Sequence, residues 1–264
     1  MSNVPHSMQI LLVAQPKGGV ARTSFCLMTA LRARQNNLRV LLVDLDRQGN
    51  LSDLFPSTRS QNASTSTASN LFSKNRQIVT EELEDGFAIL RADARLNSPK
   101  LAGRISRDDF VRNLRSVSDA YDICIIDTAK DLDQQMISLA LYAADYLVSP
   151  FTIHPGAIRE MEKLSELRIL ASKETATPVK FLGYMPTRYP ADSNRLEQLQ
   201  NAIGKANHKI LPYSLPHRAS VSAAVASRKP IWDDVSEGNI DHEQAAVEWR
   251  SAVDYILNEL KTSI

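Results

Sequence analysis

Short apolar runs alternate with longer segments of helical periodicity along the chain. The apolar runs lie at residues 8–14, 40–45, 87–91, 123–127, 146–149 and 179–184, and the periodic segments lie at 23–35, 107–117, 132–143, 157–172 and 194–206. A strand followed by a helix usually returns the chain to a parallel neighbouring strand. The pattern therefore predicts an α/β fold, with a mostly parallel twisted sheet covered by helices on both faces.

Length and composition fit one large domain. The chain has 264 residues, of which 43% are hydrophobic, and this is enough to build a single α/β core. We therefore expect a single domain over residues 1–264. The tract 57–70 has many hydroxyl side chains, one charge and no periodicity, which predicts a flexible surface loop.

The sequence favours a cytoplasmic protein. It has no run of about 18 apolar residues, and residues 1–7 lack the basic-then-apolar pattern of a secretion signal. Its two cysteines, Cys26 and Cys124, are too few for a disulfide framework or a four-cysteine metal site. Both lie among apolar residues, so we expect buried thiols.

A glycine-rich segment, residues 15–24, follows the first predicted strand directly. Such a turn between a strand and a helix directs several backbone N–H groups at one point, which suits phosphate. In the P-loop pattern G-x-x-x-x-G-K-[ST], Thr23 supplies the hydroxyl that holds Mg²⁺. However, Pro16, Ala21 and Arg22 stand where that pattern has glycine, glycine and lysine.

A second motif, Leu-Val-Asp-Leu-Asp-Arg-Gln-Gly-Asn at residues 42–50, follows the next predicted strand. Together with Lys17, Gly18 and Gly19 it resembles the ParA/MinD family of deviant Walker A ATPases, closest to the ParA-type partition proteins. That family has K-G-G-x-G-K-[ST] followed by D-x-D-P-Q-G-N, so Arg47 replaces the usual proline. Residues 121–128 are similar to the family's Walker B strand, and residues 143–150, 215–216 and 229–231 are similar to later segments.

The resemblance implies a role for each residue of the site. Lys17 would cross a dimer interface to the partner's nucleotide phosphates, and Lys17, Asp46 and Arg22 would form the catalytic set. Asp44 would support the P-loop, and Asp46 would order the attacking water or the Mg²⁺ shell. ATP would bind to Gly18, Gly19, Val20, Ala21, Arg22, Thr23 and Ser24, and Mg²⁺ would bind near Thr23, Asp46 and Asp127. The base-contacting loop near Thr187 and His217 departs from the family pattern.

Arg22 and Ala21 leave hydrolysis open. A guanidinium is planar and larger than the lysine ammonium that fits between phosphates, and glycine at position 21 would allow closer approach of the backbone. Two hypotheses follow. The chain is either a weak, partner-stimulated ATPase or a nucleotide-binding scaffold that does not hydrolyse ATP and serves a plasmid maintenance or conjugation complex.

Charge is uneven near the C-terminus although the whole chain carries only +1. Residues 186–230 contain seven basic and two acidic residues, whereas residues 231–264 contain two basic and eight acidic residues. Internal pairing on a solvated surface would explain this pattern. Alternatively, ParA-type proteins bind DNA without sequence preference through basic residues in this region, and the candidates here are Arg218, Arg228 and Lys229.

The resemblance implies a DNA-partitioning ATPase of a plasmid or chromosome. Such a protein binds ATP and Mg²⁺, forms a homodimer, coats non-specific DNA on the nucleoid and is released by a centromere-bound, ParB-like adaptor. A MinD-like, membrane-associated positioning ATPase is the further alternative. The last helix has on one side the apolar residues Val247, Trp249, Val253, Ile256, Leu257 and Leu260. Its other side disfavours a membrane role, because Glu248, Asp254 and Glu259 would face water and repel anionic lipid.

Overall fold

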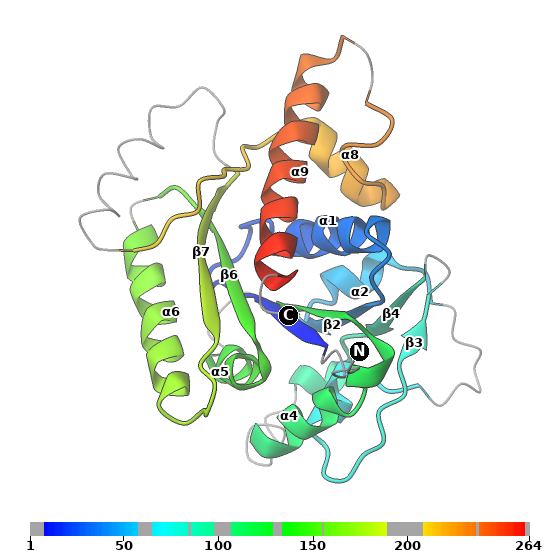
Figure 1. Ribbon diagram of the computed structural model, residues 1–264, viewed down its shortest axis with the longest axis vertical. Helices are drawn as coiled ribbons and strands as arrows, with labels where there is room; N and C mark the ends of the chain where they lie inside the picture. Colours follow the sequence, from blue (N-terminus) through cyan, green and yellow to red (C-terminus); the bar gives the residue numbers. More distant parts are fainter. Residues whose placement is uncertain are drawn as a thin grey trace, which may run out of the picture.

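A seven-stranded sheet forms the centre of the computed structural model, which describes residues 8–57, 65–83, 86–97, 107–128, 134–154, 156–188, 208–235 and 238–261 (Figure 1). The strands are β1 (Gln9–Val13), β2 (Val40–Leu45), β3 (Glu81–Glu82), β4 (Phe87–Leu90), β5 (Ile123–Thr128), β6 (Tyr146–Thr152) and β7 (Lys180–Thr187). Their order is β3-β4-β2-β5-β1-β6-β7. Only β3, at the edge, runs antiparallel to its neighbour.

Helices cover both faces of this sheet. The α-helices in the described part of the chain are α1 (Arg22–Gln35), α2 (Asn50–Leu54), α4 (Arg107–Arg115), α5 (Gln134–Ala143), α6 (Ala157–Ser172), α8 (Ala219–Ser227) and α9 (Ile240–Lys261). Three short 3₁₀ helices are η1 (Ala68–Phe72), η2 (Ala94–Asn97) and η3 (Ser118–Ala120). Figure 1 shows α4, α5 and α6 on one side of the sheet and α1, α8 and α9 on the other.

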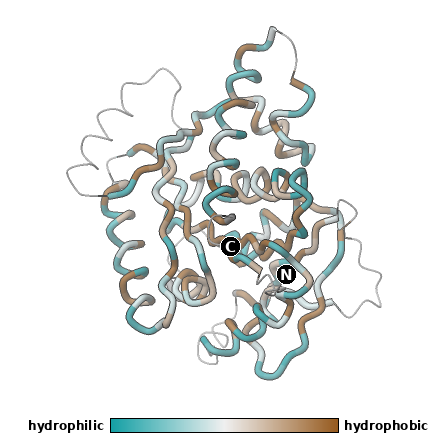
Figure 2. The backbone as a smooth tube through the Cα atoms, viewed as in Figure 1, coloured by the Kyte–Doolittle hydropathy of each residue, from teal (hydrophilic) through white to brown (hydrophobic). Residues whose placement is uncertain are grey.

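The strands are buried on both faces, which explains why they appear in the sequence as continuous apolar runs. Leu11 and Val13 of β1 pack in the cluster under α1 and α9, and Ile10 and Leu12 pack in the opposite cluster. Hydrophobic positions gather along the strands inside the molecule, whereas hydrophilic positions gather on outer helices such as α6 (Figure 2). Cys26 and Cys124 are fully buried, as predicted.

The predicted fold class is confirmed, with differences at the ends of elements. β6 and β7 continue beyond their predicted ends to Thr152 and Thr187, because each keeps pairing with the other up to that point. The edge strand β3 and the short helix α2 were not predicted, since neither has a periodic pattern long enough to stand out. The helix predicted at residues 194–206 lies outside the described residues.

The tract 57–70 differs from its prediction. Residues 58–64 lie outside the described residues, but residues 65–70 pack against the sheet and begin η1. Ser66, Ser69 and Asn70 are buried, and the Thr67 and Asn70 side chains cap η1 reciprocally with backbone N–H groups. Polar side chains that satisfy backbone groups can be buried without apolar periodicity, so composition alone suggested a loop.

The last helix packs on the domain itself. Trp249, Val253 and Ile256 of α9 are buried against the α1 side of the sheet, and Phe25 of α1 lies 6.3 Å from Trp249 between ring centroids. Val247 was expected on the apolar side but is 67% exposed. Among the described helices, none is both long and apolar enough to cross a membrane.

Candidate nucleotide-binding site

The phosphate-binding segment lies at the carboxyl end of β1 and leads into α1. Ala21 directly precedes α1 with φ 61° and ψ 27°, a left-handed conformation that L-residues other than glycine seldom adopt. Gly19 also has a positive φ, at 74°. The first amide groups of a helix have no carbonyl partner within that helix, and α1 has no acidic residue in its first turn. This end of α1 is therefore suited to an anion.

Arg22 is folded back onto the loop that contains it. Its Nη1 donates hydrogen bonds to the carbonyl oxygens of Gln15 at 2.5 Å and Lys17 at 2.7 Å, and the residue is only 6% exposed. The Nη1 end of the guanidinium therefore links two backbone carbonyls of the loop to each other. Its Nε lies 4.0 Å from Asp127 Oδ1, and neither atom has a hydrogen-bond partner among the described residues.

Asp127 lies at the end of β5, directly beside Asp44 of β2 in the strand register. Thr23 Oγ1 donates a hydrogen bond to Asp127 Oδ2 at 2.6 Å. Burial, and after it the nearby Asp44 carboxylate, raise the pKa of Asp127 to about 7, although the Thr23 hydrogen bond and the Arg22 charge oppose the shift. The fold thus places Thr23 and Arg22 next to Asp127, in agreement with the prediction that these residues lie close together.

Asp44 supports the turn that follows β2. Its Oδ1 accepts from the backbone N–H of Asp46 at 3.0 Å, and its Oδ2 accepts from the N–H and Oγ of Ser52 at 2.8 and 2.7 Å. The resemblance implied that Asp44 would support the P-loop. In the described part of the chain, its hydrogen bonds go instead to the turn after β2 and to Ser52. Burial raises the pKa of Asp44 to about 6, against the lowering effect of the Ser52 hydrogen bonds.

Asp46 lies at the same edge of the sheet and is 3% exposed. Its Oδ1 accepts from the N–H of Gln48 at 2.9 Å, and its carbonyl accepts from the N–H of Gly49 at 2.8 Å, which closes a tight turn. Arg47, within this turn, is exposed. Lys17 is partly exposed at the loop, so it remains accessible from outside the subunit.

A cavity of about 200 Å³ adjoins the start of α1. Its lining includes Ala21 and Ser24 of the phosphate-binding segment, Arg188 at the end of β7, His217 in the following loop, and Val225 of α8. Thr187 is buried and donates to the carbonyl of Val20 at 2.9 Å, so β7 is tied directly to the loop. The cavity therefore lies in the region near Thr187 and His217 where the base-contacting loop is expected from the sequence.

The donor set fits magnesium bound together with phosphate. Mg²⁺ prefers oxygen ligands and is usually held by one or two carboxylates or hydroxyls plus substrate phosphates and water. Thr23 Oγ1 and the buried, unpartnered Asp127 Oδ1 supply such oxygens. In the described part of the chain, no cluster of three or more His, Cys, Asp or Glu side chains could hold a metal without a nucleotide.

The basic residues predicted to bind DNA have different environments. Arg218 is 7% exposed and forms ion pairs with Glu248 at 2.7 Å and Asp241 at 2.9 Å, which join the start of α8 to α9. This geometry does not fit a DNA-contacting role for Arg218. Arg228 ends α8 with φ 56°, and Lys229 is exposed and paired with the exposed Asp234 at 3.0 Å. Both remain accessible at the end of α8.

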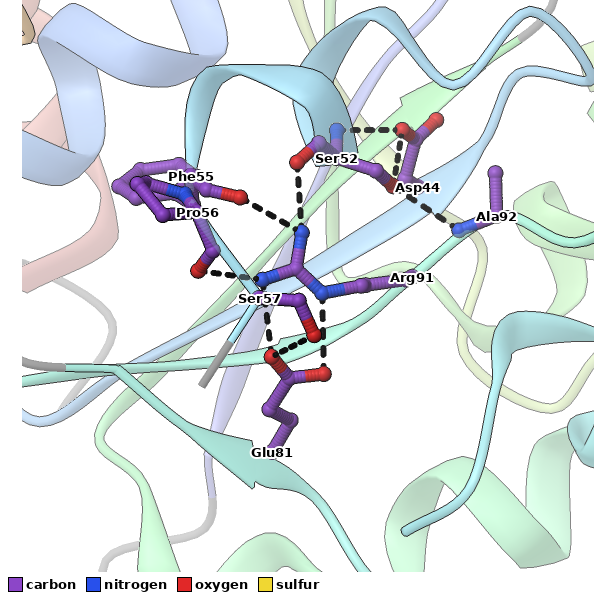
Figure 3. Close-up of polar contacts among 8 residues, drawn as sticks. All are labelled: Asp44, Ser52, Phe55, Pro56, Ser57, Glu81, Arg91 and Ala92. Carbon is purple, nitrogen blue, oxygen red and sulfur yellow. Dashed lines mark hydrogen bonds and ion pairs between the residues drawn. The ribbon is translucent and has the colours of Figure 1, made fainter. Parts of the chain in front are cut away.

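Two buried residues near the site, Ser52 and Arg91, were not found by sequence reasoning. Ser52 joins Asp44 to the backbone of Ala92, and Arg91 forms an ion pair with Glu81 (Figure 3). Arg91 is the one charged residue of the apolar run 87–91, and this was the only feature of the sequence that could have drawn attention to it. A buried arginine needs partners, but the sequence does not indicate which ones.

The fold and this site define a P-loop nucleotide-binding protein. The model of the family described as "AAA domain" matches residues 8–178. The chain belongs to this family, and within it to the ParA/MinD P-loop ATPases.

Known relatives and a solved structure agree with this assignment. Protein IncC of Escherichia coli is 28% identical, with 96% of this chain and 70% of that protein covered. A ParA family protein of Chlamydia pneumoniae is 27% identical, with 85% and 90% covered. Cobyrinic acid a,c-diamide synthase of Mycobacterium smegmatis, solved with an ATP analogue and magnesium, superposes with a TM-score of 0.73 at 21% identity, covering 97% of each chain. The relative from Chlamydia pneumoniae is named as a member of the ParA family.

The left-handed backbone at Ala21 predicts a stabilising substitution. Ala21→Gly should increase the free energy of unfolding by about 1 kcal/mol, because glycine adopts positive φ without the Cβ clash. The matched control is Asn37→Gly, since Asn37 has the same φ of 61° but asparagine tolerates it. Urea unfolding measures both, and equal changes in the two variants would contradict the strain at Ala21.

The raised pKa of Asp127 predicts a pH dependence of stability without nucleotide. Its folded pKa of about 7 lies above the ordinary aspartate pKa of 3.8, so the folded state binds the proton more tightly. The stability from this group is therefore present at low pH and is lost as pH rises from about 4 to 7. We expect Asp127→Asn to flatten the fall in unfolding free energy over that range, measured by urea titration at each pH. An unchanged slope would show that Asp127 ionises normally.

Proposed function

We propose that this chain is a ParA-like DNA-partitioning ATPase for plasmid or chromosome segregation. It binds ATP and Mg²⁺, dimerises with the nucleotide-binding edges of two subunits facing each other, and binds DNA without sequence preference. A centromere-bound, ParB-like adaptor stimulates hydrolysis and releases it. It acts in the cytoplasm, on the nucleoid.

One observation carries the proposal. Thr23 Oγ1 is hydrogen-bonded to Asp127 Oδ2 at the foot of an open anion-binding helix start, next to a cavity that a base fits. These are the hydroxyl and carboxylate that a magnesium–triphosphate complex requires. Family membership supports the same ligand, since a structural neighbour was solved with an ATP analogue and magnesium.

Each residue of the site then has a role. The backbone amides from Gly18 to Ser24 would bind phosphate, and Thr23 and Asp127 would hold Mg²⁺. Asp46 lies at the same edge and would order the attacking water or the Mg²⁺ shell. When bound, Mg²⁺ neutralises phosphate charge. Lys17, accessible at the loop, reaches the phosphates bound by the second subunit.

Arg22 acts first as a structural part of the loop. Because Nη1 is engaged with the carbonyls of Gln15 and Lys17, the guanidinium is oriented before any ligand arrives. It offers its remaining donors to phosphate as a rigid fork. Such a cation supports binding, but it cannot move with a migrating phosphoryl charge as a flexible ammonium does. Hydrolysis by this chain is therefore slow and depends on its partners.

The same contact favours the second candidate function, a nucleotide-dependent scaffold without hydrolysis. In that case the arginine holds the loop closed around a nucleotide that persists, and the dimer serves a maintenance or conjugation complex. Phosphate release in the presence of DNA and the adaptor distinguishes the two functions. A MinD-like membrane role has less support, because the apolar face of α9 is packed on the domain.

Nucleotide binding and hydrolysis can be tested by exchanging the phosphate-loop arginine. We expect the wild-type protein to bind a slowly hydrolysed ATP analogue with Mg²⁺, and Arg22→Lys to increase phosphate release on the order of tenfold, because an ammonium better follows the developing charge. Asp46→Ala should abolish release. The matched control is Arg32→Lys, also on α1 but paired with Asp254. Absence of analogue binding by calorimetry at saturating Mg²⁺ would refute the proposed function.

DNA binding can be tested at the end of α8. The double variant Arg228→Glu, Lys229→Glu should lower retention on non-specific duplex DNA and reduce the slope of log affinity against log salt by about two, one for each lost phosphate contact. Arg159→Glu on α6 is the control, since it is exposed on the other face of the sheet. An unchanged salt slope in the double variant would remove this surface from the DNA interface.

A further inference from the structure

Polar contacts within the chain hold the turn that carries Asp46. The carbonyl and the carboxylate of Asp46 both accept from backbone groups within the turn, at 2.8 and 2.9 Å. The backbone N–H of Asp46 is bound by Asp44. The position of Asp46 therefore depends on where the Asp44 carboxylate is held.

Ser52 of α2 binds the other oxygen of the Asp44 carboxylate, Oδ2. Its hydroxyl donates to Asp44 Oδ2 at 2.7 Å and accepts from the backbone N–H of Ala92 at 3.0 Å (Figure 3). Ser52 Oγ thus connects β2 to the residue that follows the end of β4 by two positions, Ala92. Ser52 is 6% exposed, so water does not readily replace this bridge.

Arg91 fixes the helix on which Ser52 lies. Its Nη1 donates to the carbonyls of Ser52 at 2.6 Å and Phe55 at 2.9 Å, and its Nη2 donates to the carbonyl of Pro56 at 3.1 Å. The last carbonyls of a helix lack their usual partners, and the guanidinium binds three carbonyls at and beyond the end of α2. The fork of Arg91 is in turn bound by both carboxylate oxygens of Glu81, at 2.8 and 2.9 Å. Glu81 is 2% exposed.

We propose that Ser52 and Arg91 are positioning residues for the magnesium-dependent step of nucleotide binding. They form a continuous chain of hydrogen bonds, Glu81–Arg91–Ser52–Asp44, that ends at the backbone of Asp46. Neither residue touches nucleotide or metal. The inference rests on the proposed function, because it assigns these residues to the Mg²⁺ shell of the same site. Residues behind a metal's direct ligands commonly change metal affinity by 10- to 100-fold when they are substituted, although they make no contact with the ion.

A purely structural role for the network would have a different signature. A buried ion pair and a buried serine contribute to stability wherever they lie. If they only hold the fold together, their removal lowers stability without any selective effect on Mg²⁺. The test must therefore separate magnesium dependence from stability and from nucleotide affinity without metal.

The experiment is a calorimetric titration of a slowly hydrolysed ATP analogue at increasing Mg²⁺ and again in EDTA, together with thermal unfolding. Ser52→Ala is the main variant, because it removes only the bridging hydroxyl and keeps the backbone bonds to Asp44 and Arg91. Ser52→Thr is the conservative variant that retains the hydroxyl. Ser69→Ala is the matched control, since Ser69 is also buried and donates its hydroxyl to a carboxylate, Asp93, at 2.6 Å, away from Asp44.

We expect Ser52→Ala to need about tenfold more Mg²⁺ for half-maximal analogue binding, with unchanged affinity in EDTA. Ser52→Thr should restore the wild-type requirement, and Ser69→Ala should lose similar thermal stability without any magnesium effect. Arg91→Lys, which keeps the charge but loses the fork, should shift the requirement in the same direction as Ser52→Ala.

Two results would overturn the inference, and they are distinguishable. If the wild-type protein binds the analogue with Mg²⁺ and Ser52→Ala behaves like Ser69→Ala, the network is structural only and the proposed function stands. If the wild-type protein shows no magnesium-dependent binding, the proposed function fails and the inference fails with it.

Discussion

Two buried carboxylates lie next to each other at the centre of this molecule, and the architecture of the site follows from that arrangement. Asp44 and Asp127 are register partners on adjacent parallel strands, and both are fully buried. Two like charges in a region of low polarity are unfavourable unless each is hydrogen-bonded or faces a cation. Thr23 and Arg22 serve Asp127 from the phosphate loop, whereas Ser52 and the backbone of Asp46 serve Asp44 from the other side. The phosphate loop, the turn after β2 and the short helix α2 are thus all bound to the Asp44 and Asp127 carboxylates.

The exchange of lysine for arginine at position 22 is accommodated within this arrangement. A guanidinium has enough donors to bind its own loop and still present a charge, which an ammonium on a flexible stem does less well. Its hydrogen bonds to the carbonyls of Gln15 and Lys17 hold the two sides of the loop together. The left-handed Ala21 next to it is the conformational cost of keeping the loop shape after glycine was lost.

Much of the fold could be predicted because its strands are buried on both faces and its helices are periodic. The phosphate loop and the acids at 44, 46 and 127 could be placed together, since the carboxyl ends of parallel strands meet at one edge. The support behind them could not be predicted. Ser52 and Arg91 act through backbone carbonyls and amides, and such contacts depend on tertiary position and leave no pattern in the side-chain sequence. The packing of residues 65–70 was missed for the same reason, because the Ser66 and Asn70 side chains accept hydrogen bonds from backbone N–H groups.

The ion pairs of Arg218 affect how charge scanning of this surface should be interpreted. The basic character of residues 186–230 suggests replacing one cation at a time and assigning each loss of DNA retention to a broken phosphate contact. At Arg218 that assignment would be misleading, because the guanidinium fastens the first turn of α8 to Glu248 and Asp241 of α9. A substitution there would displace the helix that carries Arg228 and Lys229 and also disturb a wall of the cavity beside the start of α1. DNA retention and nucleotide binding would then be lost together, although Arg218 itself need not contact DNA or nucleotide.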